Sequence, residues 1–296
     1  MNIKEYVALR KEELKKEISS YNRLPQFVIM QVNDDPASNA YIKGKLKDAA
    51  EVGINCELRK FDIDISEEEL IRQIEIINND PSVDGLIVQM PLPKHISEDN
   101  IKLAVSPKKD VDGFHPLSKL DPCTPKGIIN YLKFLKVDLV GKNAVVIGRS
   151  NIVGKPMARL LLKESCNVTV LHSKTTRKDM EMYISNADII VVAVGRAEFL
   201  NETFTYKKEA IVVDVGINRI DGHLVGDAKS GLPVQLQTPV PGGVGLITRL
   251  TLLDNLMEIF RNEIWNLKHR SIRLWKSNQS KWQPNESCLW SRRINW

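Results

Sequence analysis

The chain has 296 residues, of which 43% are hydrophobic and 27% charged; this is typical of a folded protein with room for two domains and excludes a disordered or fibrous chain. The formal net charge of +5 is concentrated at one end, because residues 261–296 carry eight Lys or Arg against two acids and leave the remainder at −1. With a net charge of only −1, residues 1–260 offer no basic surface for nucleic acid. No apolar run is long enough to cross a bilayer.

The first twenty residues, MNIKEYVALRKEELKKEISS, mix Glu and Lys at helical spacing, unlike a secretory signal or a mitochondrial transit peptide. The cysteines form no CxxC pair and lie far apart, so we expect neither a metal site nor a disulfide framework; they are Cys56, Cys123, Cys166 and Cys288. We therefore expect a cytoplasmic protein with a helix at its start.

Short β-branched runs alternate with amphipathic helical stretches in the first third of the chain. The predicted strands lie near 27–32, 55–61 and 83–90, and the predicted helices cover 37–52 and 66–79. This order predicts βαβ units and a mostly parallel sheet. The alternation of strands and helices stops at segment 106–125, which is polar and contains prolines. This segment is the predicted connection between domains.

A second α/β unit follows. Its predicted elements are a helix at about 126–135, a strand at 143–148, a helix over 154–164, and strands at 167–172, 187–195 and 210–216. We expect an α/β protein with a catalytic domain over 1–122, a Rossmann-type domain over 123–245, and a last helix at about 246–263 that packs back on the first domain. All five tryptophans lie in 265–296, a basic segment that we expect to be a tail outside the core.

The segment VVIGRSNIVGKPMARLLL (145–162) runs from a strand through Gly148, Arg149, Ser150 and Gly154 into a helix. A glycine turn before a helix lets backbone N–H groups approach a pyrophosphate, so this segment predicts a dinucleotide site. Because Ser150 stands where the GxGxxG pattern has its second glycine, an ordinary strand–turn–helix is the alternative.

The next strand ends in His-Ser-Lys-Thr (172–175), where an NAD site would have an acid for the ribose hydroxyl. Arg149, Ser173 and Lys174 are donors suited to a 2′-phosphate instead, which favours NADP; a solvated turn is the alternative. Strands 191–195 and 210–218 reach the same sheet edge and add Gly195 and Ile217 as candidate cofactor contacts.

On the first domain, Tyr41 and Lys45 are four residues apart and share one helix face. A lysine shielded beside an aromatic ring loses its proton more easily and can act as an acid or base, although an exposed lysine over a packed tyrosine has the same spacing. Gln89 ends a buried strand, where it would face a cleft or cap the strand. Asp110 and Asp112 precede a glycine, and the two interpretations are that they contact a ligand or that they form a turn.

Pro241 and Gly242 lie in TPVPGGVG (238–245), a loop that either approaches a ligand closely or only connects two elements. Together with this loop, several motifs in matching order over about residues 1–260 resemble the bifunctional methylenetetrahydrofolate dehydrogenase/methenyltetrahydrofolate cyclohydrolase family. They are SNAYIKGK (38–45), DGLIVQMPLP (84–93), KKDVDGFHP (108–116), PCTPKG (122–127), GRSNIVGKP (148–156) and HSKT (172–175).

The resemblance implies oxidation of 5,10-methylenetetrahydrofolate by NADP, followed by hydrolysis of the methenyl cation to 10-formyltetrahydrofolate, in one-carbon metabolism that serves purine biosynthesis. It implies that Lys45 is the acid/base of hydrolysis, that Gln89 tunes it, that Tyr41 positions the folate and that Asp112 holds the pterin. It further implies a homodimer acting on tetrahydrofolate derivatives, without nucleic acid, membrane or metal.

Two departures from the family pattern concern the nicotinamide side: Leu246 replaces the usual proline, and 227–237 is short and dissimilar. They leave open a folate- or dinucleotide-binding protein without turnover, which would bind but form no NADPH. A dehydrogenase that uses NAD or lacks hydrolysis, and a nucleic-acid binder acting through the tail, are further alternatives.

Overall fold

The computed structural model describes the backbone of residues 2–279 and the side chains of 2–36 and 38–265. Its N-terminal unit is a three-stranded parallel sheet in the order β2-β1-β3. The strands are β1 (Gln26–Gln31), β2 (Asn55–Lys60) and β3 (Gly85–Val88), and the helices connecting or following them are α2 (Pro36–Val52), α3 (Glu67–Asn79) and α4 (Glu98–Ala104). Alternate residues of β1 and β3 face opposite sides, so α3 and α4 cover one face while α2 lies on the other.

The second unit is a five-stranded parallel sheet in the order β10-β7-β6-β4-β5. Its elements are β4 (Asn143–Ile147), α6 (Gly154–Lys163), β5 (Asn167–Leu171), α7 (Arg177–Ser185), β6 (Ile189–Val192), β7 (Ile211–Asp214) and β10 (Leu236–Gln237). A small antiparallel hairpin of β8 (Asn218–Ile220) and β9 (His223–Val225) projects beside it. The continuous apolar runs of β6 and β7 are fully buried, as expected for strands covered on both faces.

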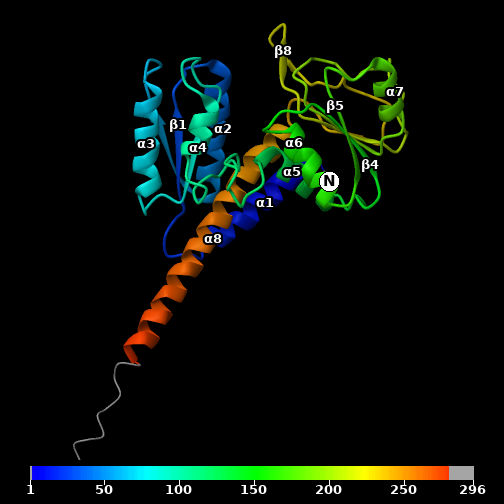
Figure 1. The fold of residues 1–296 in the computed structure, drawn as a ribbon. Helices are drawn as coiled ribbons and strands as arrows, with labels where there is room; N and C mark the ends of the chain where they lie inside the picture. Colours follow the sequence, from blue (N-terminus) through cyan, green and yellow to red (C-terminus); the bar gives the residue numbers. More distant parts are fainter. Residues whose placement is uncertain (1, 280–296) are drawn as a thin grey trace, which may run out of the picture.

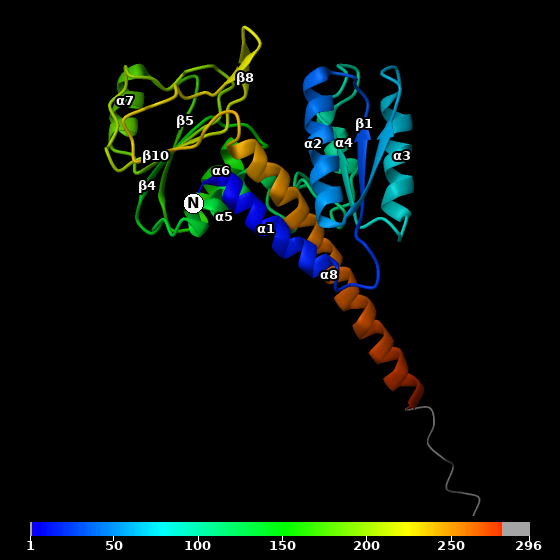
Figure 2. The ribbon, with the colours of Figure 1, turned by 180° about the vertical axis from the view of Figure 1, so that it is seen from behind.

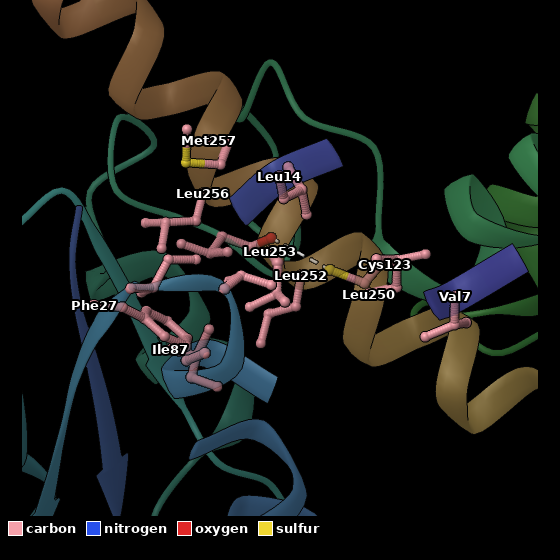
Figure 3. Close-up of a cluster of buried hydrophobic side chains, with 14 of the residues drawn as sticks. Val7, Leu14, Phe27, Ile87, Cys123, Leu250, Leu252, Leu253, Leu256 and Met257 are labelled. Carbon is pink, nitrogen blue, oxygen red and sulfur yellow. Dashed lines mark hydrogen bonds between the residues drawn. The ribbon is translucent and has the colours of Figure 1, made fainter. Parts of the chain in front are cut away.

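Three helices lie between the two sheets: α1 (Ile3–Ile18), α5 (Cys123–Phe134) and α8 (Val244–Gln279) (Figures 1 and 2). Helix α5 packs on the second sheet through Ile128 and Leu132 and on the first core through Tyr131. Figure 3 shows the first core, in which α8 side chains meet residues of α1, β1 and β3; the labelled members include Leu14, Phe27, Ile87, Leu253, Leu256 and Met257. The last helix therefore completes the N-terminal core.

Several observed elements differ from the expected ones. Helix α8 begins two residues before the expected 246 and continues to Gln279, because no glycine or proline interrupts 246–279; this carries it into the segment expected as a tail. Helices α4 and α7 and the β8–β9 hairpin were not expected, since they are short or largely exposed and have weak apolar periodicity. The tail residues 280–296 lie outside the described part of the chain.

Over the described residues, none of the helices combines the length and the apolar character needed to span a lipid bilayer.

Candidate active site

Helix α2 holds Tyr41 and Lys45 on one face, as their spacing predicts. The side chain of Asp35 accepts the N–H of Ser38 at the start of the helix, Pro36 occupies its first turn, and Gly53 ends it with a left-handed φ of 89°. The ammonium nitrogen of Lys45 lies 5.0 Å from the centre of the Tyr41 ring. These caps fix where the helix begins and ends, and hence where Tyr41 and Lys45 lie along the sheet.

Gln89 meets Lys45 from the end of β3. Lys45 Nζ donates a hydrogen bond to Gln89 Oε1 at 3.0 Å, and Gln89 Nε2 donates to the carbonyl of Met90 at 2.6 Å. The second bond orients the amide so that its oxygen faces the lysine. Because β1 and β3 are neighbours and α2 leaves the end of β1, the pair forms at the carboxyl edge where the chain order reverses, the usual place for ligands in such sheets.

Lys45 is only 5% exposed. Burial lowers the pKa of Lys45 because it disfavours the charged ammonium, and the nearby carboxyl of Asp112 opposes this effect. Burial also raises the pKa of Tyr41 and of Asp112, and it raises the pKa of Cys56 to about 12. Burial therefore raises the pKa of these acidic neighbours and makes the proton of Lys45 easier to release.

The two aspartates of the predicted site have different roles. The carboxylate of Asp110 accepts the N–H groups of Gly113 at 3.1 Å and His115 at 2.8 Å, so it shapes the turn. Gly113 has a φ of 73° and lies against the backbone of Asp121, which leaves no room for a side chain. Asp112 is the one that interacts electrostatically with Lys45. Asp110 is therefore a turn former, and Asp112 remains the candidate site residue.

The turn between β4 and α6 has the close approaches that the dinucleotide hypothesis requires. A Cβ on Gly148, whose φ is 122°, would lie 2.3 Å from the carbonyl oxygen of Ala193, and a Cβ on Gly154 would lie 2.3 Å from that of Gly148. The hydroxyl of Ser150 accepts the N–H groups of Val153 and Gly154. Ser150 therefore closes the turn with its side chain, at the position where the glycine-rich pattern has a glycine.

The N–H groups of Gly154 and Lys155 at the start of α6 are paired with Ser150, so it is the helix dipole that would favour a phosphate at this end. Arg149, Ser150 and Ser173 are exposed at the carboxyl ends of β4 and β5. Gly195 follows β6 and is also exposed, and Ile217, which follows β7, is 60% exposed. Since the strand order reverses between β4 and β6, this group surrounds the ligand-binding position of the second sheet.

Pro241 and Gly242 lie directly before α8, and Gly242 has a φ of 90°. The loop is therefore joined to the helix that packs on α2, so its position is tied to the N-terminal unit as well as to the second sheet.

A pair of buried carboxylates organises the loops after β6 and β7, and sequence analysis missed it. Asp227 accepts the N–H groups of Val194, Gly195 and Arg196 at 2.6 to 2.9 Å. Asp214 accepts those of Asp227 and Ala228 at 2.9 and 2.8 Å, and burial raises its pKa to about 6. These contacts join positions far apart in sequence. The one local signal is an acid within an apolar run, in VVDVG (212–216).

A second missed group comes from α8 and contacts α2 and α5. The guanidinium of Arg249 pairs with Asp48 of α2 at 2.8 Å, and Thr248 hydrogen-bonds to Thr124 of α5 at 2.8 Å. Nothing in the sequence indicates which residue of α2 a last helix would meet.

Comparisons with known proteins agree with this two-part site. The family model described as tetrahydrofolate dehydrogenase/cyclohydrolase, catalytic domain, matches residues 1–112, and the model of the NAD(P)-binding domain of the same family matches residues 122–264. Bifunctional protein FolD of Brevibacillus brevis is 47% identical over 252 residues, which are 81% of this chain and 88% of the relative.

Two solved structures are similar over most of their length. The bifunctional enzyme FolD, a methylenetetrahydrofolate dehydrogenase/cyclohydrolase from Campylobacter jejuni, is 41% identical with a TM-score of 0.83, covering 87% of this chain and 96% of that one. The Trypanosoma brucei N5,N10-methylenetetrahydrofolate dehydrogenase-cyclohydrolase, complexed with NADP cofactor and inhibitor, is 28% identical with a TM-score of 0.84, covering 89% and 97%.

Proposed function

Because this chain belongs to the tetrahydrofolate dehydrogenase/cyclohydrolase family, we propose that the buried Lys45–Gln89 pair is the acid/base centre of its hydrolytic reaction. The chain is a bifunctional enzyme of one-carbon metabolism. It oxidises 5,10-methylenetetrahydrofolate with NADP and hydrolyses the resulting 5,10-methenyltetrahydrofolate to 10-formyltetrahydrofolate.

The observation that carries the proposal is a lysine 5% exposed that donates a hydrogen bond to the amide oxygen of Gln89, whose own amide is held by the carbonyl of Met90. An uncharged amine is the better proton acceptor, and burial favours that form. In hydrolysis, the oxygen of water bonds to the methenyl carbon and gives a proton to Lys45. Lys45 then returns that proton to N5 as the bond between that carbon and N5 breaks, and the proton of the remaining hydroxyl is released to water as its oxygen becomes the carbonyl oxygen, which leaves the formyl group on N10.

The folate has three further proposed contacts. Tyr41 presents its ring on the same face as Lys45 and would stack against the planar part of the substrate. Asp112, whose pKa is raised by burial, would hydrogen-bond the pterin. Pro241 and Gly242 would close the substrate position from the loop before α8. Their joint effect is to align the methylene carbon, which hydride transfer requires more than it requires an acid or base.

The second sheet fits the cofactor, since Gly148 and Gly154 allow the tight turn and the close packing of helix on strand that a dinucleotide-binding turn needs. NADP supplies the acceptor for the hydride and its electron pair. We propose that the α6 end and Ser150 bind its phosphates, and that Arg149 and Ser173 bind the 2′-phosphate. Gly195 and Ile217 would border the nicotinamide.

We further propose that residues 1–122 with the last helix form the folate-binding unit and 123–245 the dinucleotide-binding unit. A homodimer in the cytoplasm, with no nucleic-acid or membrane partner, completes the proposal. The β8–β9 hairpin exposes Ile220 and Leu224 and offers an apolar surface to a second copy, for which the molecular mass in solution is the test.

The test of the Lys45 assignment is Lys45→Met, assayed for each reaction separately. We expect hydrolysis of supplied methenyltetrahydrofolate to fall by about 100-fold or more, the contribution typical of acid–base catalysis, while NADP reduction persists and the methenyl compound accumulates. Equal loss of both reactions with altered folding would show a structural role only. Retained hydrolysis would refute the assignment.

A further inference from the structure

Arg249 of α8 lies directly against the catalytic face of α2. A Cβ built on Gly44 would come within 2.0 Å of Arg249 Nη1, so the guanidinium occupies the space beside the residue that precedes Lys45. The side chain of Arg249 is 22% exposed. A positive charge is therefore held at the helix surface next to the site, largely out of water.

Asp48 forms an ion pair with this side chain. Its Oδ2 lies 2.8 Å from Arg249 Nε, while its Oδ1 accepts a hydrogen bond from Lys11 of α1 at 2.6 Å. Lys11 also bonds Glu51 at 2.9 Å. Asp48 is 4% exposed, three residues after Lys45 on α2. Two cations thus share one buried carboxylate, and Arg249 Nη1 lies against Gly44, the residue before Lys45.

The groups that act electrostatically on Lys45 come from four elements: Asp112 from the loop between α4 and α5, Cys56 from β2, Cys123 from α5 and Arg249 from α8. Burial raises the pKa of both thiols, which are therefore uncharged near neutral pH. Asp112 and Arg249 remain, and they oppose each other: the carboxylate favours the ammonium form of Lys45, and the guanidinium favours the amine. The same guanidinium also lowers the pKa of Tyr41.

We propose that Arg249, paired with Asp48 against the surface of α2, is a positioning residue for hydrolysis that keeps Lys45 in the uncharged, proton-accepting form. The inference rests on the proposed role of Lys45. Its alternative is that Arg249 only fastens α8 to α2, in which case its removal would lower stability without changing how hydrolysis depends on pH.

The chain contains a matched control for that alternative. Arg261, three turns further along α8, forms a comparable ion pair with Glu17 of α1, in which Arg261 Nη2 donates to Glu17 Oε2 at 2.6 Å. It fastens the same helix but does not act on Lys45. Arg261→Gln therefore removes a similar contact without removing a charge from the site.

The experiment measures kcat for methenyltetrahydrofolate hydrolysis against pH in the full chain and in Arg249→Gln, Arg249→Lys, Arg261→Gln and Lys45→Met. We expect Arg249→Gln to move the midpoint of the rising limb up by about one pH unit, because it removes a positive charge from the surroundings of a buried amine. Below the midpoint this is about a tenfold loss of rate, with the plateau retained. Arg249→Lys keeps the charge and should restore the midpoint, and Arg261→Gln should not move it.

An unchanged midpoint in Arg249→Gln, with hydrolysis abolished in Lys45→Met, would overturn this inference and leave the role of Lys45 intact. Equal shifts in Arg249→Gln and Arg261→Gln would overturn it too, because they would reflect a general loosening of α8. If Lys45→Met still hydrolyses the substrate, the proposed function of Lys45 fails and the inference fails with it.

Discussion

Replacing Asp227 by asparagine should separate the two reactions of this enzyme. The Asp227 side chain is fully buried, and its two oxygens accept four hydrogen bonds, from the N–H groups of Val194, Gly195 and Arg196 and from Asn218 Nδ2. These donors belong to the loops after β6 and β7, which border the proposed nicotinamide position.

The magnitude follows from the number of acceptors lost. Asparagine keeps one oxygen and replaces the other by an NH2 group, so two of the four donors lose their partner and face another donor. A buried polar group left unpaired costs about 1–3 kcal/mol, which gives a loss of about 2–5 kcal/mol in the free energy of unfolding after partial relaxation. The two loops should loosen together, because one carboxylate holds both.

The assay combines urea unfolding with separate measurements of the two activities. We expect the KM for NADP to rise by about tenfold or more, since binding then has to order the loops. Hydrolysis of supplied methenyltetrahydrofolate should stay within about twofold, because its proposed acid/base residue, Lys45, belongs to the N-terminal unit. Asn218→Ala, which removes one of the four donors and leaves the carboxylate, should give a smaller effect in the same direction.

A stability loss below about 1 kcal/mol together with an unchanged KM for NADP would refute this reasoning, since the four hydrogen bonds would then count for little. Parallel loss of both activities would contradict the assignment of these loops to the cofactor side.

Two further predictions concern the same sheet. Gly148→Ala should lower stability by about 2–4 kcal/mol and weaken NADP binding in a thermal-shift titration, because the left-handed φ and the carbonyl 2.3 Å from the new Cβ both oppose it; normal NADP affinity would contradict the tight turn. Burial raises the pKa of Asp214 to about 6 from 3.8, so the folded state binds its proton more tightly than the unfolded chain and Asp214 stabilises the fold most at low pH. The stability of the wild type relative to Asp214→Asn should therefore fall as pH rises from about 4 to 6 and level off above that, and a flat difference in urea unfolding over this range would contradict it.

The sequence predicts the regular parts of this fold well, because their signal is local. The strand expected at 143–148 is observed over Asn143–Ile147, and the helix expected at 66–79 over Glu67–Asn79. The apolar runs that mark them are buried on one or both faces, so periodicity and β-branched content suffice. Helix α7 was not predicted from the sequence, because Ile184 is its one fully buried side chain and gives no apolar periodicity.

The candidate site also has a part that local sequence predicts and a part that it does not. Tyr41 and Lys45 could be paired from their spacing on one helix, whereas the partnership of Lys45 with Gln89 depends on strand order. Contacts between elements far apart in sequence, such as Arg249 with Asp48, depend on how a late helix packs on an early one, and no local pattern encodes that.

Helix α8 gives the chain an unusual order of assembly. The N-terminal core joins Phe27 and Ile29 of β1 to Leu256 and Phe260 of α8, so its last components leave the ribosome after the whole second unit has been made. At ordinary rates of translation this delay is on the order of ten seconds, during which the apolar faces of α1 and α2 have no α8 to cover them. The core on the α6 side of the second sheet needs only Val244 from that helix. The unit that comes second in the sequence can therefore be the first to finish folding on the nascent chain, and the unit that emerges first must wait for the last helix.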